Sequence, residues 1–88
     1  MADTDRRVFG FNATTGTIGV TTEIIRLDTR ALVTGILDPP VFDSIANRIT
    51  VAVIGSGMTR GLTYELSVIE HKPNNGRETA ITVIGCVA

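Results

Sequence analysis

Apolar and polar residues alternate along most of this 88-residue chain, which predicts strands rather than helices. Side chains on a β-strand point to opposite faces with a period of two, so alternation indicates a strand with one buried face. Clusters of threonine, glycine, asparagine, aspartate and proline separate the runs, as turns do. The predicted strands are 7–12, 21–28, 30–37, 48–56, 63–72 and 78–87.

The residue composition supports this interpretation. Thirteen threonines, ten isoleucines and nine valines make β-branched residues more than a third of the chain. Such side chains suit a pleated sheet better than a helix. Only residues 39–49, which begin with Pro39-Pro40, offer a single helical turn. We therefore predict an all-β fold, a small antiparallel β-sandwich or barrel of about six strands.

The first 20 residues differ from the rest because threonine and glycine interrupt their alternation. Two interpretations stay open for residues 1–20: an extended N-terminal arm, or a first strand that completes the sheet. Phe9 and Phe11 share one side of this segment and would anchor an arm to a neighbouring subunit. Residues 21–88 are predicted to form a single β-sandwich domain.

The last two predicted strands form a hairpin whose register follows from parity. Their apolar positions are Tyr64, Leu66, Val68, Ile81, Val83 and Val87. A two-residue turn at Asn75-Gly76 places both apolar sets on one face, with Leu66 opposite Gly85, and a four-residue loop keeps the same parity. Asn-Gly also suits the positive φ angles of a type I′ turn. Gly76→Val is therefore expected to cost on the order of 1 kcal/mol or more, since a β-branched residue resists positive φ.

The same register places other apolar side chains on the opposite face, away from the predicted core. Ile69 and Ile84 lie there with Ile54 from the preceding strand, and Cys86 shares this face. These residues either sit beneath a loop or contact another chain. With the two phenylalanines of the N-terminal segment, the predicted interface residues are Phe9, Phe11, Ile54, Ile69, Ile84 and Cys86.

The length of the chain limits its stability as a single subunit. A chain this short buries only about 60 to 65% of its unfolded surface. Its single cysteine excludes an internal disulfide, and its single histidine, His71, excludes a Cys/His zinc site within one chain. Partner subunits remain as a source of stability. We therefore expect a homo-oligomer or a subunit of a larger assembly.

The charge balance and the lengths of the apolar runs argue against nucleic-acid and membrane partners. Eight basic and nine acidic side chains are scattered along the chain, whereas nucleic-acid binding requires a basic face. No run approaches the roughly 20 apolar residues of a membrane span, and the acidic start of the chain is unlike a secretory signal. We expect neither nucleic-acid nor membrane binding, and synthesis in a cytoplasm.

Candidate chemistry is sparse along the chain. His71, the only candidate base, lies at the polar end of the hairpin, where a solvated histidine is expected. The glycine-rich stretch GSGMTRG (55–61) joins two strands, whereas phosphate-binding loops precede a helix. Asp3 and Asp5 could bind a cation as a pair, but they lie in the N-terminal tail, and the other acidic residues are spread singly, whereas calcium ligands converge in one loop. We predict no catalytic, cofactor-binding or metal-binding residues, and therefore no enzyme.

The second half of the chain, residues 49–87, combines several turn and strand signals. These are Gly55-Ser56-Gly57 at a bend, Gly61-Leu62-Thr63-Tyr64 opening the next strand, Gly76-Arg77 in a turn, and Val87 in the closing strand. This half resembles the Ig-like β-sandwich domains of structural proteins in tailed bacteriophages. The resemblance implies an Ig-like sandwich that binds or supports other virion proteins and carries no catalytic residues.

These features predict a non-enzymatic structural protein of a tailed-phage virion, made in the host cytoplasm. Our first expectation is a capsid cement, or decoration, protein that contacts the major capsid protein and copies of itself. One alternative is a head–tail or tail accessory subunit. Another, from a different class, is a ligand-binding module such as a host-glycan adhesin. Sugar sites favour exposed aromatic residues, and the aromatic residues of this chain are Phe9, Phe11, Phe42 and Tyr64.

Overall fold

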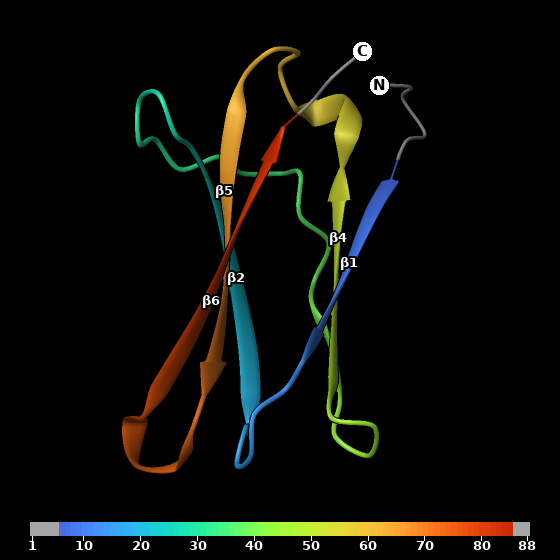
Figure 1. Cartoon of the computed structure of the whole chain (residues 1–88), viewed down its shortest axis with the longest axis vertical. Coiled ribbons are helices and arrows are strands. Elements are labelled where there is room, and N and C mark those ends of the chain that lie inside the picture. The colour runs from blue at the N-terminus through green and yellow to red at the C-terminus, as the bar shows by residue number, and fades with distance from the viewer. Residues whose placement is uncertain (1–5, 86–88) are drawn as a thin grey trace.

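The computed structural model describes residues 6–85, apart from the side chain of Ser56, and contains six strands in two sheets (Figure 1). The strands are β1 (Arg6–Asn12), β2 (Gly19–Arg26), β3 (Val41–Asp43), β4 (Arg48–Ile54), β5 (Thr63–His71) and β6 (Arg77–Gly85). The first sheet has the order β1-β4-β3 and the second β2-β5-β6, with antiparallel neighbours throughout. The predicted all-β sandwich is confirmed. Within residues 6–85, no helix has the length and apolarity to cross a membrane.

The core lies between the sheets and is built mainly from alternate residues of the two central strands, β4 and β5. The buried hydrophobic residues are Ile24, Ile36, Ile49, Val51, Val53, Met58, Tyr64, Leu66, Val68 and Ile84. Removing each large apolar side chain from water contributes roughly 1.5 to 3 kcal/mol. The Tyr64 hydroxyl accepts a hydrogen bond from the Thr59 N–H at 2.7 Å, so its polar end is satisfied within the core.

Residues 6–12 form the first strand of the fold. β1 pairs with β4 along its whole length, from Arg6 opposite Ile54 to Asn12 opposite Arg48. Phe9 and Phe11 point inward and pack against the core cluster. Of the two interpretations of the N-terminal segment, the structure shows the strand for these residues. Residues 1–5 lie outside the described part of the chain.

The predicted strand at 30–37 does not form. This segment makes only isolated bridges, Leu32 with Ile25 and Leu37 with Val53, as it crosses from the second sheet to the first. Positive φ angles at Arg30 (60°) and Gly35 (85°) break the extended conformation. The expected helical turn at 39–49 is also wrong, because β3 and β4 form a short hairpin there.

The predicted register of the β5–β6 hairpin is wrong by three residues. Leu66 pairs with Thr82, and Ser67 with Ile81, so paired residue numbers sum to 148 rather than 151. The turn is the Pro73–Asn75 segment, closed by a hydrogen bond from Lys72 N–H to the Gly76 carbonyl at 2.8 Å. Asn74 and Asn75 adopt the positive φ angles, whereas Gly76 has a φ of −70°. The loop between the closing pair therefore has an odd length.

An odd shift reverses the two faces of a strand. Ile84 is consequently in the core at 4% exposure, opposite Tyr64, and is not an outer-face residue. Ile81 and Val83, which were predicted to be buried, are 59% and 60% exposed. The isoleucine at the end of β6 fills the core, while its two preceding apolar residues face outward.

Candidate functional site

The sandwich is covered on one side. The connection from β2 to β3 runs along that side, where Val33 N–H donates to the Ile24 carbonyl at 2.9 Å. Farther along, Ile54 N–H donates to the Ile36 carbonyl at 2.8 Å. This chain segment occupies backbone groups at the edge of β2 and extends the line of β3 beside β4. On this side the connection covers the Ile24–Arg26 end of β2 and the part of β4 near Ile54.

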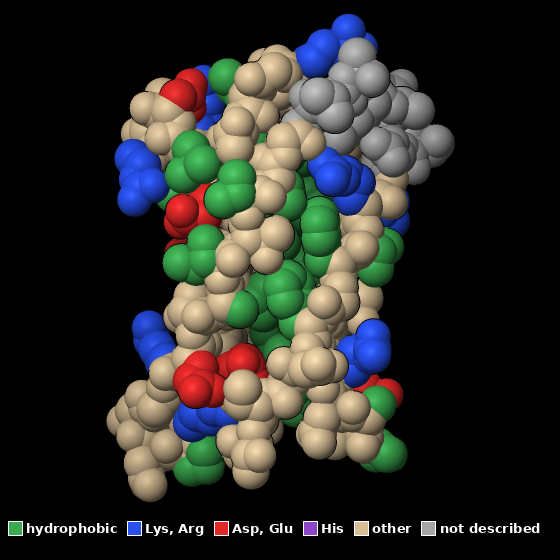
Figure 2. All heavy atoms as spheres, in the orientation of Figure 1, with side chains coloured by type: hydrophobic (Ala, Val, Ile, Leu, Met, Phe, Trp, Pro, Cys, Tyr) green, Lys and Arg blue, Asp and Glu red, His purple; other side chains and the backbone are tan. Residues whose placement is uncertain are grey.

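On the opposite side the two sheets end in the edge strands β1 and β6, which no other strand covers (Figure 1). Figure 2 shows hydrophobic side chains along a lengthwise hollow in this face of the molecule. We call this gap between β1 and β6 the seam. Its open volume near the hairpin end is about 340 Å³ and is lined by Asn12, Thr14, Glu70, Glu78, Thr79 and Ala80.

Polar contacts cross the seam at both of its ends. At one end, Arg7 Nη1 donates a hydrogen bond to the Gly85 carbonyl at 2.6 Å. The Arg7 guanidinium also lies 5.6 Å from the centre of the Phe9 ring, within range of a cation–π contact. At the other end, the turn between β1 and β2 contacts the β5–β6 hairpin.

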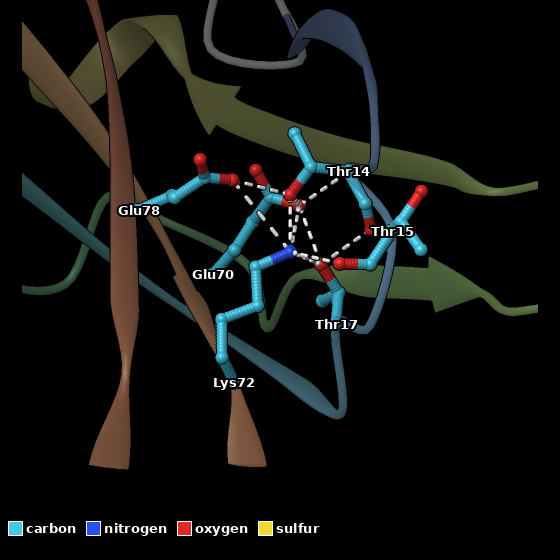
Figure 3. A network of polar contacts seen from close by, with 6 residues as sticks. All are labelled: Thr14, Thr15, Thr17, Glu70, Lys72 and Glu78. Carbon is cyan, nitrogen blue, oxygen red and sulfur yellow. Dashed lines mark hydrogen bonds and ion pairs between the residues drawn. The ribbon is translucent and has the colours of Figure 1, made fainter. Parts of the chain in front are cut away.

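These hairpin-end contacts form a polar cluster (Figure 3) whose members are Thr14, Thr15, Thr17, Glu70, Lys72 and Glu78. Glu70 is the buried charge, with 5% of its surface exposed. One of its carboxylate oxygens accepts hydrogen bonds from Thr17 Oγ1 at 2.6 Å and from Thr14 N–H at 2.7 Å. A buried carboxylate costs free energy unless such donors replace water.

Lys72 holds the cluster together by using all three of its protons. Its Nζ donates to the Thr15 carbonyl at 2.9 Å, to Thr17 Oγ1 at 2.8 Å and to Thr14 Oγ1. It also lies 3.6 Å from Glu78 Oε2 and 4.0 Å from Glu70 Oε1. Glu70 and Glu78 are direct cross-strand partners, an arrangement that repels when both are charged. The ammonium group offsets that repulsion.

The cluster keeps Glu70 ionised. Burial by itself would raise the pKa of Glu70, but hydrogen bonds from Thr17 and Thr14, with the charge of Lys72, outweigh burial and lower that pKa below its ordinary value. The Thr14 hydroxyl has one proton, so it donates to Glu70 or to Glu78 but not to both at once. Glu70 Oε1 and the Lys72 ammonium group are thus bound by threonines of the β1–β2 turn and lie within ion-pair distance of one another.

The six residues predicted as an interface do not form one surface. Phe9 and Phe11 face the core, Ile84 is inside it, and Cys86 lies outside the described residues. Ile54 is half-buried in the first sheet and Ile69 is half-buried on the outer face of the second. The hairpin register moves Ile84 into the core, and the pairing of β1 with β4 turns Phe9 and Phe11 inward.

Sequence reasoning missed the exposed large apolar residues of β6, Ile81 and Val83. They stand on the outer face of the second sheet, on the same strand that borders the seam. Only the loop length distinguishes this arrangement from the predicted one. The motif Pro73-Asn74-Asn75-Gly76 permits positive φ at several positions, so it does not fix that length.

Little else in the described residues points to chemistry. His71 Nε2 lies 2.9 Å from Thr21 Oγ1, on the outer face of the second sheet rather than in a cavity. Among residues 6–85, no group of three or more His, Cys, Asp or Glu side chains could hold a metal ion. Comparison of the chain with models of known families, with curated proteins and with solved structures found no match.

Proposed function

We propose that this protein is a non-enzymatic structural subunit of a tailed-phage virion, made in the host cytoplasm and acting through protein–protein contacts. Its first role in this proposal is that of a capsid cement protein, which binds the major capsid protein and other copies of itself. The resemblance of residues 49–87 to Ig-like domains of phage structural proteins supports the virion setting.

One observation carries the structural role: the molecule presents apolar β-branched residues and a long strand edge to solvent, while its buried carboxylate is bound by groups of the same chain. Ile81 and Val83 are exposed on β6. Glu70 and Lys72 spend their polar atoms on threonines of the same chain. Exposed apolar residues beside an open edge are typical of surfaces that contact another protein.

The experiment is immunogold labelling of virions of the phage that encodes the chain, with an antibody raised against the purified protein. The cement role predicts label over the head and a high copy number by quantitative mass spectrometry of the particles. Label confined to the tail or the head–tail junction would instead support the accessory-subunit role. Virions that lack the protein would overturn the proposal.

A glycan-binding role has less support in the geometry. Tyr64 is buried, and Phe9, Phe11 and Phe42 are half-buried and packed against the core. Sugar-binding surfaces usually present an aromatic ring to solvent, and none of these four rings does so. A glycan array with the purified chain tests this alternative, and specific binding to a host glycan would favour it.

A further inference from the structure

The four sheet edges of the described chain differ in how well they are protected against pairing with a strand of another molecule. Residues 31–33 cover part of β2, and β3 is only three residues long. β1 carries Arg6 and Arg7 at one end and is interrupted by Gly10. β6 is nine residues long, and between Glu78 and its end it has neither a charged residue nor a proline. An edge of this kind readily pairs with another strand.

The free backbone groups of β6 follow from the hairpin register. Lys72 and Gly76 are a hydrogen-bonded pair, and bonded pairs recur at every second residue along an antiparallel ladder. Even-numbered residues of β6 therefore point their N–H and C=O groups toward β5. Thr79, Ile81 and Val83 point theirs toward the seam. The hydrogen bond from Arg7 to the carbonyl of Gly85, another odd-numbered residue, agrees with this assignment.

The side chains of the same residues are suited to a cross-strand partner. Ile81 and Val83 are exposed on the outer face, and β-branched pairs across a ladder stabilise a sheet. On the inner face, Ala80 and Thr82 are small, so a strand beside β6 would meet no bulky side chain there. A strand in this position would also lie next to the seam and cover apolar surface that the fold leaves open.

We propose that β6 pairs with β6 of a second copy of this chain, antiparallel and about a two-fold axis at Ile81, to make one continuous six-stranded sheet. Residue numbers of pairs across the new ladder then sum to 162. Ile81 meets Ile81 of the second copy, and Thr79 meets Val83. This register aligns all nine residues of both strands, and the three central pairs satisfy the free groups of Thr79, Ile81 and Val83.

Charge complementarity favours this occupant. Arg77 stands at one end of β6, and Glu65, on β5, stands beside Val83 near the other end. Antiparallel pairing brings Arg77 of each copy opposite Gly85 of the other, where the missing side chain leaves a path toward Glu65. Glu78 meets Ile84, so no like charges are directly opposite. A register shifted toward the hairpin would instead place the Arg77 side chain beside Ile81.

This inference deepens the proposed structural role, on which it rests, by naming the surface through which copies of the subunit associate. The experiment below uses the purified chain without virions. A monomer that still labels phage heads would overturn the pairing and leave the proposed function intact. A β6-paired dimer that is absent from virions would overturn the proposed function and leave the pairing intact.

The register is tested by cysteine cross-linking in a Cys86→Ser background. The Cα atoms of a hydrogen-bonded antiparallel pair are about 5.5 Å apart, so Ile81→Cys is expected to form a covalent dimer with a short thiol cross-linker. Val83→Cys alone is the matched control, because its two copies are offset by four residues, about 13 Å along the strand. Mixing Val83→Cys with Thr79→Cys chains should restore the cross-link. Equal cross-linking of all variants, or none, would overturn the register.

The association itself is tested by sedimentation equilibrium of the full chain. We expect a dimer that Ile81→Lys converts to a monomer, because two like charges would lie directly opposite each other across the new ladder. Ile45→Lys is the control, since Ile45 is 95% exposed and lies in the turn between β3 and β4. Circular dichroism confirms that both variants fold. A wild-type monomer, or a dimer that survives Ile81→Lys, would overturn the proposal.

Discussion

Glu70 shows how one side chain ties distant parts of this chain together. Its carboxylate lies on β5, yet its donors Thr14 and Thr17 belong to the turn between β1 and β2. Removal of one member of a buried, hydrogen-bonded charge set leaves the others uncompensated. The stabilisation that Glu70 contributes therefore depends on Lys72 and the two threonines.

Glu70→Ala is expected to lower the free energy of unfolding by on the order of 3 kcal/mol, because Lys72 would keep its charge without the buried carboxylate beside it. Urea denaturation followed by circular dichroism measures the change. Glu78→Ala is the control: its side chain is 56% exposed, and its loss should cost less than about 1 kcal/mol. Equal effects of the two substitutions would contradict the account of the cluster.

The pH dependence of stability follows from the lowered pKa of Glu70, whose ordinary value is 4.5. The unfolded chain binds this proton more readily than the folded chain, so the stabilisation is complete above the ordinary value and is lost as pH falls through the folded-state pKa. We expect the midpoint of urea unfolding to fall below about pH 4.5 and Glu70→Gln to flatten that fall. The Asp28 pKa is also lowered, by its hydrogen bond from Arg26, but this pair is exposed. An unchanged slope in Glu70→Gln, with the slope lost in Asp28→Asn, would contradict this assignment.

The conformation of the hairpin turn depends on several of its residues together. Asn74 and Asn75 take left-handed conformations, which asparagine tolerates better than β-branched residues do. Gly76 has an ordinary φ, but a Cβ there would lie 3.1 Å from the Lys72 Cβ. Both features keep Lys72 and Gly76 close enough to close the loop.

Asn74→Val is expected to destabilise the protein by about 1 kcal/mol or more, because a β-branched residue resists positive φ. Asn74→Gly, which removes that strain, should leave stability within about 0.5 kcal/mol. Thermal and urea denaturation of the two variants provide the comparison. If Val and Gly at this position gave the same stability, Asn74 would not adopt the left-handed conformation in solution.

Deletion of residues 1–12 is expected to unfold the chain. β1 supplies one of the three strands of the first sheet, and Phe9 and Phe11 cover the core from that edge. Circular dichroism and a melting curve of the truncated chain check this, with deletion of residues 1–4 as the control. A folded truncated chain with a near-normal melting temperature would show that β1 adds little to the sandwich.

The sequence predicts some elements of this fold well and others poorly, for identifiable reasons. β4 and β5 alternate strictly, so Val51 and Leu66 are assigned to the core from the pattern alone. The register of β6 depends on whether the loop has an even or an odd length, and Asn-Asn-Gly permits both. The polar cluster was not predictable, because Thr14 and Glu70 are 56 residues apart and only the paired sheets bring them together.

At the scale of the whole molecule, the sandwich is asymmetric. The long β2–β3 connection covers one side, whereas the seam between β1 and β6 is bridged at its ends and open between them (Figures 1 and 2). A small domain with little core gains stability when a second subunit covers such a surface. In our proposal, β6 is the edge through which a second copy covers this surface.

The most direct test of this account is amide hydrogen exchange measured at several protein concentrations. If β6 pairs with a second copy, the amides of Thr79, Ile81 and Val83 become protected as concentration rises. The amides of Val8 and Gly10, on the free edge of β1, should continue to exchange fast. The hydrogen bond from Ala13 N–H to the Asn47 carbonyl shows that odd-numbered residues of β1 point their backbone groups toward β4, so even-numbered residues point theirs away from it. Exchange at the three β6 amides that is fast and independent of concentration would contradict assembly through this edge.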